Sequence, residues 1–382
     1  MAETPWLPHN EAEPTVQLVL PDGSENTDTQ WDHYRNLVKD VDAATWRTWY
    51  RDMALMRRFD EEATALQRTG ELALFTQARG QEAAQIGSVH ATRAQDWIFP
   101  AYREHGVLQV RGVPLKEELH LFRGVDHGGW DTEKHHVHLN TLVISAHTLH
   151  ATGYAMGIQR DGLVATGDPD TDAAVMVYFG DGATSEGDTS EALNFAAVNQ
   201  APVVFFCQNN QWAISVPGTR QYRGPLVRRG AGFGVPCVRV DGNDVLAVHA
   251  VTREAMERAR NGGGPTFIEA VTFRQGAHTT SDDPTRYRGT DEEQYWSQRD
   301  PVERVVARLR AMGAWDERFH TEVTHEADEF AAELRTYVRS LGRPASSAMF
   351  DHVYATPHAI NQTERDWFAG FERDLADGEG GH

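Results

Sequence analysis

Two polar segments of this sequence, each following an apolar run, carry residue types that bind a hard cation. Residues 173–179 form an apolar run that ends in a Gly-Asp-Gly turn centred on Asp181, and residues 203–207 form a second run followed by an asparagine pair ending at Asn210. Magnesium is usually held in proteins by one or two carboxylates together with substrate phosphates, and an amide oxygen is a further suitable ligand. The glycines at positions 180 and 182 let the backbone approach a phosphate. The pattern therefore predicts a site for a magnesium ion that carries a diphosphate.

The two segments must lie side by side for this site to form. Continuous apolar runs near residues 173–179, 203–206, 237–241 and 267–273 alternate with helical patterns such as that of residues 244–260. This alternation is typical of a parallel sheet covered by helices on both faces. Ligands of such sheets bind beyond the carboxyl ends of the strands, where both polar segments fall. We therefore predict an α/β fold with a parallel sheet flanked by helices on both faces.

Two other interpretations of the glycine-rich turn are weaker. The tripeptide on its own is common as a tight turn, and the asparagine pair as the end of a strand. The glycines at 180, 182 and 187 do not have the spacing of a Gly-x-Gly-x-x-Gly dinucleotide loop. The upstream linker of residues 166–172 imitates a calcium loop, but Ala173 and Phe179 stand where that loop needs glycine and glutamate.

A second group of candidate residues lies in a hydrophobic turn at residues 97–106. It presents Tyr102, Arg103 and His105 together, and such a combination of an aromatic ring, a guanidinium group and an imidazole suits an anion site. The four histidines between residues 127 and 138 also raise the question of a metal. They cluster in one loop without a second group of ligands, so a solvated loop is the favoured interpretation.

Composition limits the classes of protein to which the chain can belong. The formal charge of −20 over 382 residues disfavours binding to nucleic acid, whose phosphates would be repelled. No apolar run approaches the length of a membrane span, and the first residues lack the pattern of a signal peptide. The two cysteines lie in apolar runs, which favours a reducing compartment. A cytoplasmic location is therefore expected.

The sequence suggests three regions. Residues 1–40 read as an extended, partly disordered arm, residues 41–300 as the α/β domain and residues 301–382 as a helical region. Asp42 is the expected N-cap of the first long helix, and a further helix is expected over residues 81–94. Asp188 and Glu191 have the spacing of a capping box.

The central stretch, read in its full context, resembles a known family. The motif begins at Gly180 with Gly-Asp-Gly-Ala-Thr-Ser-Glu-Gly-Asp, continues after a spacer with Gln-Asn-Asn-Gln-Trp-Ala-Ile-Ser from Gln208, and returns at residues 276–288. It resembles the thiamine diphosphate motif, and more specifically the alpha subunit of the decarboxylating component of bacterial two-subunit 2-oxo acid dehydrogenases. The resemblance covers about residues 45–315. It implies a thiamine diphosphate-binding fold that uses thiamine diphosphate and magnesium.

The resemblance also implies roles for individual residues. The magnesium ligands would be Asp181, Asn210 and the main-chain oxygen of Trp212, while Gly182, Ala183, Tyr102 and Arg103 would hold the diphosphate. Main chain near Leu142 and Ile144 would meet the aminopyrimidine ring. His278 would be an active-site histidine that titrates near neutrality and assists substrate binding and acyl transfer, and His105 is a weaker candidate for the substrate channel. Arg286 and Arg288 would either order their loop or face an acidic lipoyl domain.

The family's partners follow from the same resemblance. It implies an α2β2 assembly in which a beta subunit supplies the activating glutamate, so the chain alone is expected to be inactive. The substrate would be pyruvate or a branched-chain 2-oxo acid and the acceptor a lipoyl domain of the acyltransferase component. Pyruvate enzymes of the mammalian type carry a histidine before Gly-Gln-Glu-Ala, where this chain has residues 75–79 without one. An acetoin dehydrogenase alpha subunit and a non-catalytic diphosphate-binding scaffold are the alternatives.

Overall fold

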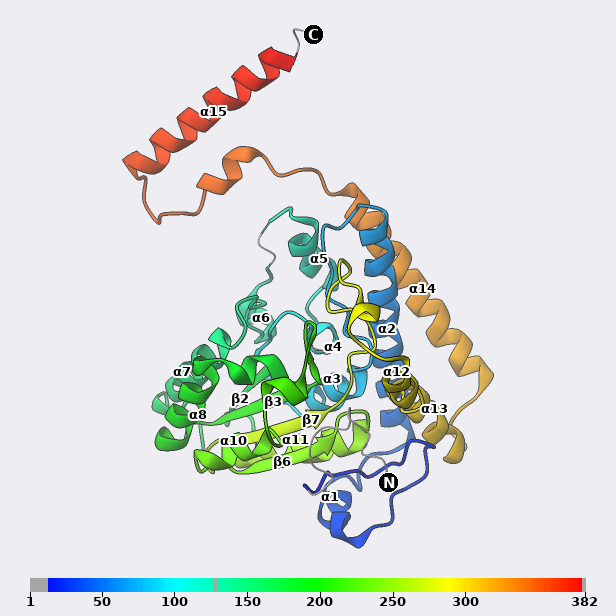
Figure 1. The fold of residues 1–382 in the computed structure, drawn as a ribbon. Helices are drawn as coiled ribbons and strands as arrows, with labels where there is room; N and C mark the ends of the chain where they lie inside the picture. Colours follow the sequence, from blue (N-terminus) through cyan, green and yellow to red (C-terminus); the bar gives the residue numbers. More distant parts are fainter. Residues whose placement is uncertain (1–12, 127–128, 380–382) are drawn as a thin grey trace.

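The centre of the computed structural model is a parallel sheet of five strands in the order β1-β2-β3-β7-β6. The structure describes residues 13–126 and 129–379. The strands are β1 (Trp97–Phe99), β2 (Val175–Gly180), β3 (Val203–Asn209), β6 (Cys237–Asp241) and β7 (Thr266–Val271). Figure 1 shows helices on both faces of this sheet, so the predicted α/β fold class is confirmed.

Alternate residues of the central strands feed two hydrophobic clusters, one on each face. Met176 and Tyr178 of β2 join a cluster with α2 (Ala43–Arg68) and α11 (Val245–Arg260), whereas Val177 and Phe179 join a cluster with α7 (Ala146–Arg160) and α8 (Gly187–Asn199). A strand that is buried on both faces has no solvent-facing positions. This is why β2 and β3 read as unbroken apolar runs in the sequence.

The other elements surround this core. They are η1 (Thr29–Trp31), α1 (Asp32–Leu37), α3 (Glu82–Val89), α4 (His105–Val110), α5 (Leu115–Arg123), α6 (Thr132–His135), η2 (Asp181–Ser185), β4 (Trp212–Ala213), β5 (Val216–Pro217), α9 (Gly218–Gln221), α10 (Val227–Gly232), η3 (Pro284–Arg286), α12 (Thr290–Ser297), α13 (Pro301–Ala311), α14 (Glu317–Ser340), η4 (Ser346–Phe350) and α15 (Ala359–Glu379). The two short strands β4 and β5 form an antiparallel pair beside the sheet. Within the described residues, none of the helices is long and apolar enough to span a membrane.

Helix boundaries test the capping predictions. The Asp42 side chain accepts a hydrogen bond from the Thr45 N–H at the start of α2, as predicted. Helix α3 ends at Val89 and is therefore shorter than the predicted 81–94. The capping box is wrong, because α8 begins at Gly187 and Asp188 already lies in its first turn.

Residues 13–40 are not the extended arm that the sequence predicts, because Val16 pairs with β6 and α1 packs against α11. Val16 forms a parallel bridge with Val240 of β6, and the N–H groups of Leu18 and Val19 donate to Asp244 at 2.6 and 2.7 Å. The other oxygen of Asp244 caps α11, so one buried carboxylate holds both segments. Residues 1–12 lie outside the described part of the chain.

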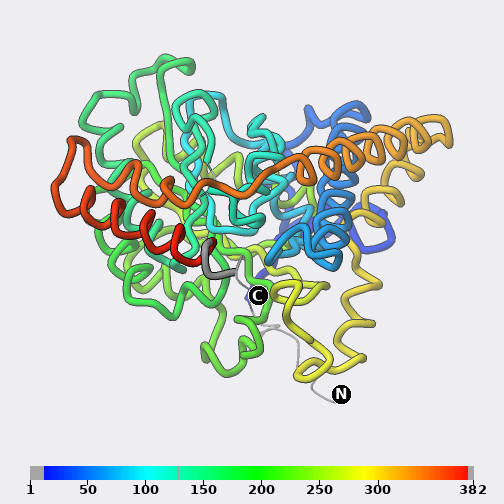
Figure 2. Tube along the Cα trace, turned by 90° about the horizontal axis from the view of Figure 1, so that it is seen from above, coloured from blue at the N-terminus to red at the C-terminus, as the bar shows by residue number. Residues whose placement is uncertain are grey.

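The C-terminal helices divide into two groups. Helix α14 runs beside α2 in both views (Figures 1 and 2), and Leu334 of α14 shares a hydrophobic cluster with Phe59 of α2. Helix α15 lies apart from the body and packs on η4, with Trp367 exposed by 68%. The hydrophobic clusters run across residues 40 and 300, and the domain limits at these positions stay predictions.

Candidate functional site

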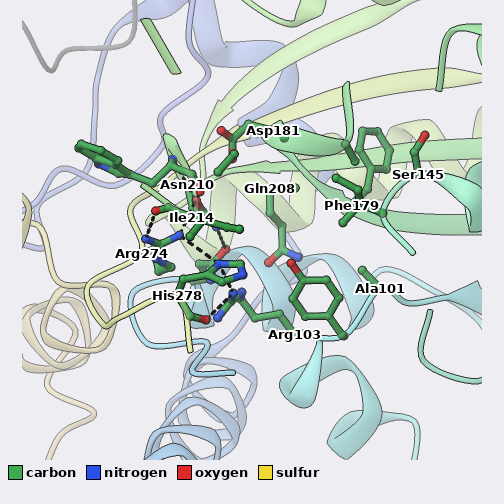
Figure 3. Close-up of a pocket in the computed structure, with 18 of the residues that line it drawn as sticks. Ala101, Arg103, Ser145, Phe179, Asp181, Gln208, Asn210, Ile214, Arg274 and His278 are labelled. Atoms are coloured by element: carbon green, nitrogen blue, oxygen red, sulfur yellow. Dashed lines mark hydrogen bonds between the residues drawn. The ribbon is translucent and has the colours of Figure 1, made fainter. Parts of the chain in front are cut away.

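A pocket with a volume of about 190 Å³ opens at the carboxyl ends of β2 and β3 (Figure 3). It brings together segments that lie up to nearly 200 residues apart in the sequence. Its lining residues are Gln81, Ala101, Tyr102, Arg103, Glu104, Ile144, Ser145, His147, Phe179, Gly180, Asp181, Gly182, Ala183, Gln208, Asn210, Trp212, Ala213, Ile214, Arg274 and His278.

Most of the residues that the sequence singled out line this pocket. The exceptions are Leu142, which is 58% exposed on the protein surface, His105, Arg286 and Arg288. Ile144, two residues after Leu142, does line the pocket. The lining side chains come from strand ends and from loops, which a parallel sheet places at one edge.

Asp181 and Asn210 lie next to one another because β2 and β3 are in register, with Gly180 opposite Gln208. The buried carboxylate of Asp181 accepts a hydrogen bond from Nε2 of Gln221 at 3.1 Å. The Asn210 carboxamide is fixed from two sides, since its Oδ1 accepts from the Trp212 N–H at 3.3 Å and its Nδ2 donates to Oε1 of Gln81 at 3.1 Å. A carboxylate and an oriented carboxamide are therefore available at adjacent strand ends.

Gly182 allows the main chain to close tightly around this point. A Cβ atom at Gly182 would lie 2.9 Å from Cβ of Ala213, so β4 and η2 can approach only if this position has no side chain. At Gly180 a Cβ would meet no atom within 4 Å, because that residue faces the open pocket. The two glycines thus have different roles, one in packing and one in leaving the pocket open.

Arg103 and Arg274 form a positively charged side of the pocket. Arg103 donates to the main-chain oxygens of Gln77 and, at 2.9 Å, of His278. Arg274 donates to the main-chain oxygens of Trp212 at 3.0 Å and Ile214 at 2.8 Å. Within residues 13–126 and 129–379, neither guanidinium forms an ion pair with a carboxylate. Two buried guanidinium groups that have no direct ion pair with a carboxylate favour the binding of a phosphate.

His278 lies between these two arginines (Figure 3). Its ring Nδ1 is 3.3 Å from Nη2 of Arg103 and 3.4 Å from Nη1 of Arg274. The main-chain N–H of His278 donates to the Asp282 carboxylate. Burial and the two guanidinium groups lower the pKa of His278 to about 3. The expectation of titration near neutrality is therefore wrong for the cofactor-free chain, in which His278 is neutral at physiological pH.

The carboxylates of the pocket have the opposite shift. Burial raises the pKa of Asp181 to about 6, and the Gln221 hydrogen bond and Arg274 oppose this rise only in part. Burial also raises the pKa of Glu104, whose carboxylate accepts from Nε2 of Gln208 at 2.7 Å and from the Ala101 N–H at 2.8 Å. A cation beside Asp181 would relieve the unfavourable charge.

His105 is not part of the pocket, which corrects its assignment to a substrate channel. Its fully buried ring lies 2.9 Å from Glu118 through Nδ1 and 2.7 Å from the Thr76 carbonyl through Nε2, and it stacks on Phe75. Glu118 and Asp60 raise the pKa of His105 to about 9 despite its burial. His105 therefore supports the segment that leads to Gln77 and the Arg103 guanidinium, and it does not face a ligand.

The histidine-rich loop packs against the sheet more than expected. The ring of His136 stacks on Trp97 with centroids 5.0 Å apart, and that of His138 stacks on Phe99 at 4.8 Å. His127 lies outside the described residues. Among those that are described, no group of three histidine, cysteine or acidic side chains could hold a metal ion. The predicted magnesium site is of a different kind, since it would use a single carboxylate.

Arg288 and Arg286 differ in role. Arg288 is buried and donates to the main-chain oxygens of Arg274, Gln275 and Gly276, so it orders its loop and does not face a partner domain. Arg286 is exposed on the same loop. For Arg288, these contacts favour the prediction that it orders its loop over the prediction that it faces a lipoyl domain.

Replacing Arg288 by methionine should loosen this loop. Three carbonyl groups lose a charged donor, which we expect to lower the free energy of unfolding by about 1–3 kcal/mol and to speed chymotryptic cleavage after Tyr287. Arg286→Met is the matched control, because its side chain is exposed. Equal cleavage rates in the two variants would show that Arg288 does not order the loop.

Sequence reasoning missed several pocket residues, above all Arg274, Gln81 and Ser145. Ser145 has a positive φ of 76°, a conformation that is unfavourable for a residue with a side chain and that often marks a functional site. The dipeptide Gly-Gln at residues 80–81 carries no local pattern that predicts a binding role. Arg274 lies two residues before the motif at residues 276–288, and this proximity was the one signal for it in the sequence.

The fold and the pocket together define a class of protein. Adjacent parallel strands end in a carboxylate and a carboxamide, opposite two guanidinium groups, as in an α/β enzyme that binds a cation and a diphosphate. The donors are of the right chemistry for such a group, and the buried Nε2 of Gln81 and Nε of Arg274 have no partner within the described residues. The residues present thus fit a bound metal diphosphate.

The chain belongs to the dehydrogenase E1 component family, which it matches over residues 50–340. This confirms the resemblance inferred from the motifs, and it places the chain in a family of thiamine diphosphate-dependent enzymes with a thiamine diphosphate-binding fold. The match ends at the last residue of α14, so η4 and α15 lie beyond it.

Three relatives illustrate the family. The 3-methyl-2-oxobutanoate dehydrogenase subunit alpha of Mycobacterium tuberculosis is 45% identical over 353 residues, which cover 92% of each chain. The pyruvate dehydrogenase E1 component subunit alpha of Acholeplasma laidlawii is 37% identical over 82% of this chain and 90% of its own length. That of Staphylococcus epidermidis is 37% identical over 72% of this chain and 73% of its own length.

Proposed function

We propose that this chain is the alpha subunit of a 2-oxo acid dehydrogenase of the two-subunit type. It would act in the thiamine diphosphate-dependent oxidative decarboxylation of pyruvate or a branched-chain 2-oxo acid and in transfer of the acyl group to a lipoyl group of the acyltransferase component. The family match supports this, together with the names of relatives that cover most of the chain. The cytoplasmic location stays a prediction.

The observation that carries the proposal is the charge arrangement of the pocket. Asp181 is a buried carboxylate without a cation in hydrogen-bond contact, and Arg103 and Arg274 are buried cations without a carboxylate partner among the described residues. A magnesium ion and a diphosphate together would compensate both. Uncompensated buried charges are unfavourable, so an arrangement of this kind is typical of a binding site.

Several residues of the pocket would then have a role. Asp181 and the Oδ1 of Asn210 would hold magnesium, and Arg103, Tyr102 and the main chain at Gly182 and Ala183 would hold the diphosphate. The main-chain oxygen of Trp212 stays a predicted third ligand of the metal, although it already accepts a hydrogen bond from Arg274. Thiamine diphosphate, when bound, supplies the electron sink for decarboxylation.

His278 would act on the substrate side of the pocket. Its Nδ1 faces two guanidinium donors, so the neutral ring carries its hydrogen on Nε2, which can donate to a carboxylate or a carbonyl oxygen. Tyr102 lies edge-on to the same ring at 6.3 Å. These contacts fix the direction in which Nε2 presents its hydrogen.

A beta subunit would complete the site. Exposed apolar side chains surround the mouth of the pocket, and such a patch is typical of a protein interface. They are Leu142, Val143, Ile144, Ile214 and Val216, which are between 40% and 70% exposed. We infer that a beta subunit covers them in an α2β2 assembly and supplies the glutamate that activates the aminopyrimidine ring.

The substrate can be tested on the assembled complex. The higher identity to the 3-methyl-2-oxobutanoate enzyme favours a branched-chain 2-oxo acid over pyruvate. We expect carbon dioxide to be released faster from 3-methyl-2-oxobutanoate than from pyruvate when the chain is combined with its beta partner. Cleavage of acetoin without carbon dioxide release from either 2-oxo acid, or no reaction with any of the three compounds, would contradict the proposal.

A further inference from the structure

Gln81 is a pocket residue whose side-chain amide has a hydrogen-bond partner for its oxygen but, among the described residues, none for its nitrogen. It is 1% exposed and precedes the first turn of α3. Its Oε1 accepts a hydrogen bond from Nδ2 of Asn210 at 3.1 Å, whereas its Nε2 has no hydrogen-bond partner within the described residues. A buried donor without a partner is unfavourable. The Nε2 group therefore lacks an acceptor among the described residues.

The orientation of both amide groups follows from the hydrogen bonds around them. The main-chain N–H of Trp212 donates to Asn210, which identifies the Asn210 atom that receives it as the oxygen. Nδ2 of Asn210 must then face Gln81, and Gln81 must present its oxygen in return. Exchanging the oxygen and nitrogen of either side chain would place two donors face to face. Nε2 of Gln81 is thus the atom left to face the ligand.

The backbone on either side of Gln81 is held in place. Gly80 has a φ of 93°. A Cβ atom at Gly80 would lie only 2.2 Å from the carbonyl oxygen of Phe273. The Gly80 carbonyl accepts from Thr272 at 2.6 Å, and its N–H donates to Glu82, which pairs with Arg57. Gln81 therefore reaches the pocket from a rigid segment.

Two acceptors that line the pocket already receive hydrogen bonds from other donors of the protein. Oδ1 of Asn210 receives the Trp212 N–H, and the Glu104 carboxylate receives Gln208 and the Ala101 N–H. Asp181, Asn210 and Arg103 line the same pocket. An anionic oxygen of a ligand held by these residues is the acceptor that suits an amide N–H here.

We propose that Gln81 positions the bound cofactor through both ends of its amide. Its Oε1 holds the Asn210 carboxamide with Oδ1 available to the metal, and its Nε2 donates to an oxygen of the diphosphate. This inference rests on the proposed function and adds a residue to that site.

Two substitutions separate the two contacts. Gln81→Glu keeps an oxygen for Asn210 and removes the donor, whereas Gln81→Met has a similar length and removes both. Gln109→Met is the matched control, because Gln109 is a partly buried glutamine of the adjacent helix α4 that donates to the Asp52 carbonyl and does not line the pocket.

Binding is measured by titration calorimetry on the assembled alpha–beta complex freed of cofactor, with thiamine diphosphate and with inorganic diphosphate, at several magnesium concentrations. We expect both Gln81 variants to weaken binding of each probe by about 10- to 100-fold, as for the loss of a hydrogen bond to a charged group. Only Gln81→Met should also raise the magnesium concentration needed for half-maximal binding. The Gln109 variant should bind like the wild type.

Binding within twofold of the wild type for both Gln81 variants and both probes would overturn the inference and leave the proposed function intact. Absence of binding to the wild-type complex would overturn both. Melting temperatures of the cofactor-free complexes identify a folding defect, and the Gln81→Glu variant carries the test if Gln81→Met does not assemble.

Discussion

Replacing Asp181 by asparagine should abolish magnesium-dependent cofactor binding and at the same time stabilise the cofactor-free protein. The substitution preserves the shape of the side chain and an oxygen for the hydrogen bond from Gln221. It removes the carboxylate that would bind the metal. Removing one partner of a buried charge pair costs about 3–5 kcal/mol, so affinity should fall by at least about 100-fold.

The gain in stability follows from the pKa of Asp181. Burial raises this pKa from 3.8 to about 6, so the folded state binds the proton more tightly than the unfolded state does. The resulting stabilisation is complete below about pH 4 and is lost as the pH rises through 6. At pH 8 the ionised carboxylate is then unfavourable by about 3 kcal/mol, a penalty that asparagine does not have.

Urea unfolding of the cofactor-free chain at pH 4 and pH 8 measures this effect, and calorimetry measures binding. At pH 8 the Asp181 variant should have a higher free energy of unfolding than the wild type. This difference should be smaller at pH 4. Asp188→Asn is the control, since Asp188 lies seven residues later, outside the pocket. A variant that keeps magnesium-dependent binding would exclude Asp181 as a metal ligand.

Replacing His278 by asparagine should have the second large effect, on turnover and not on cofactor affinity. Asparagine can still offer an oxygen to Arg103 and Arg274 in place of Nδ1, and the main-chain bond from Arg103 is unchanged. The donor at Nε2 is lost. Turnover of the assembled complex should fall by about 100- to 1,000-fold, the range for the loss of one hydrogen-bond donor to a developing negative charge.

The pH dependence gives this prediction a separate test. The pKa of His278 is lowered to about 3, so protonation of this ring should produce no change in rate between pH 5 and 8. His249→Asn is a matched control, because His249 is another buried histidine, with a pKa lowered to about 4, that lies outside the pocket. A wild-type rate change near pH 6.5 that disappears only in the His278 variant would contradict the neutral ring.

The part of the site that the sequence predicted depends on local pattern. Asp181 and Asn210 each follow an apolar strand, and adjacent parallel strands always bring such positions to one edge. The fold class follows from the same runs, since only strands buried on both faces are continuously apolar.

The part that was missed depends on long-range packing. Gln81 and Arg274 reach the pocket from segments far apart in the chain, and no local pattern distinguishes them from other polar residues. His105 follows Arg103 by two residues, yet α4 begins there and turns its ring toward Glu118. The edge pairing of Val16 with Val240 was equally hidden, because its partner lies 224 residues away.

Titration of thiamine diphosphate into the assembled alpha–beta complex, with and without magnesium, tests the central claim most directly. If the ends of β2 and β3 hold a metal diphosphate, binding should require magnesium in the wild type and should be lost in the Asp181→Asn variant. Binding of equal strength without magnesium, or none under either condition, would contradict the account.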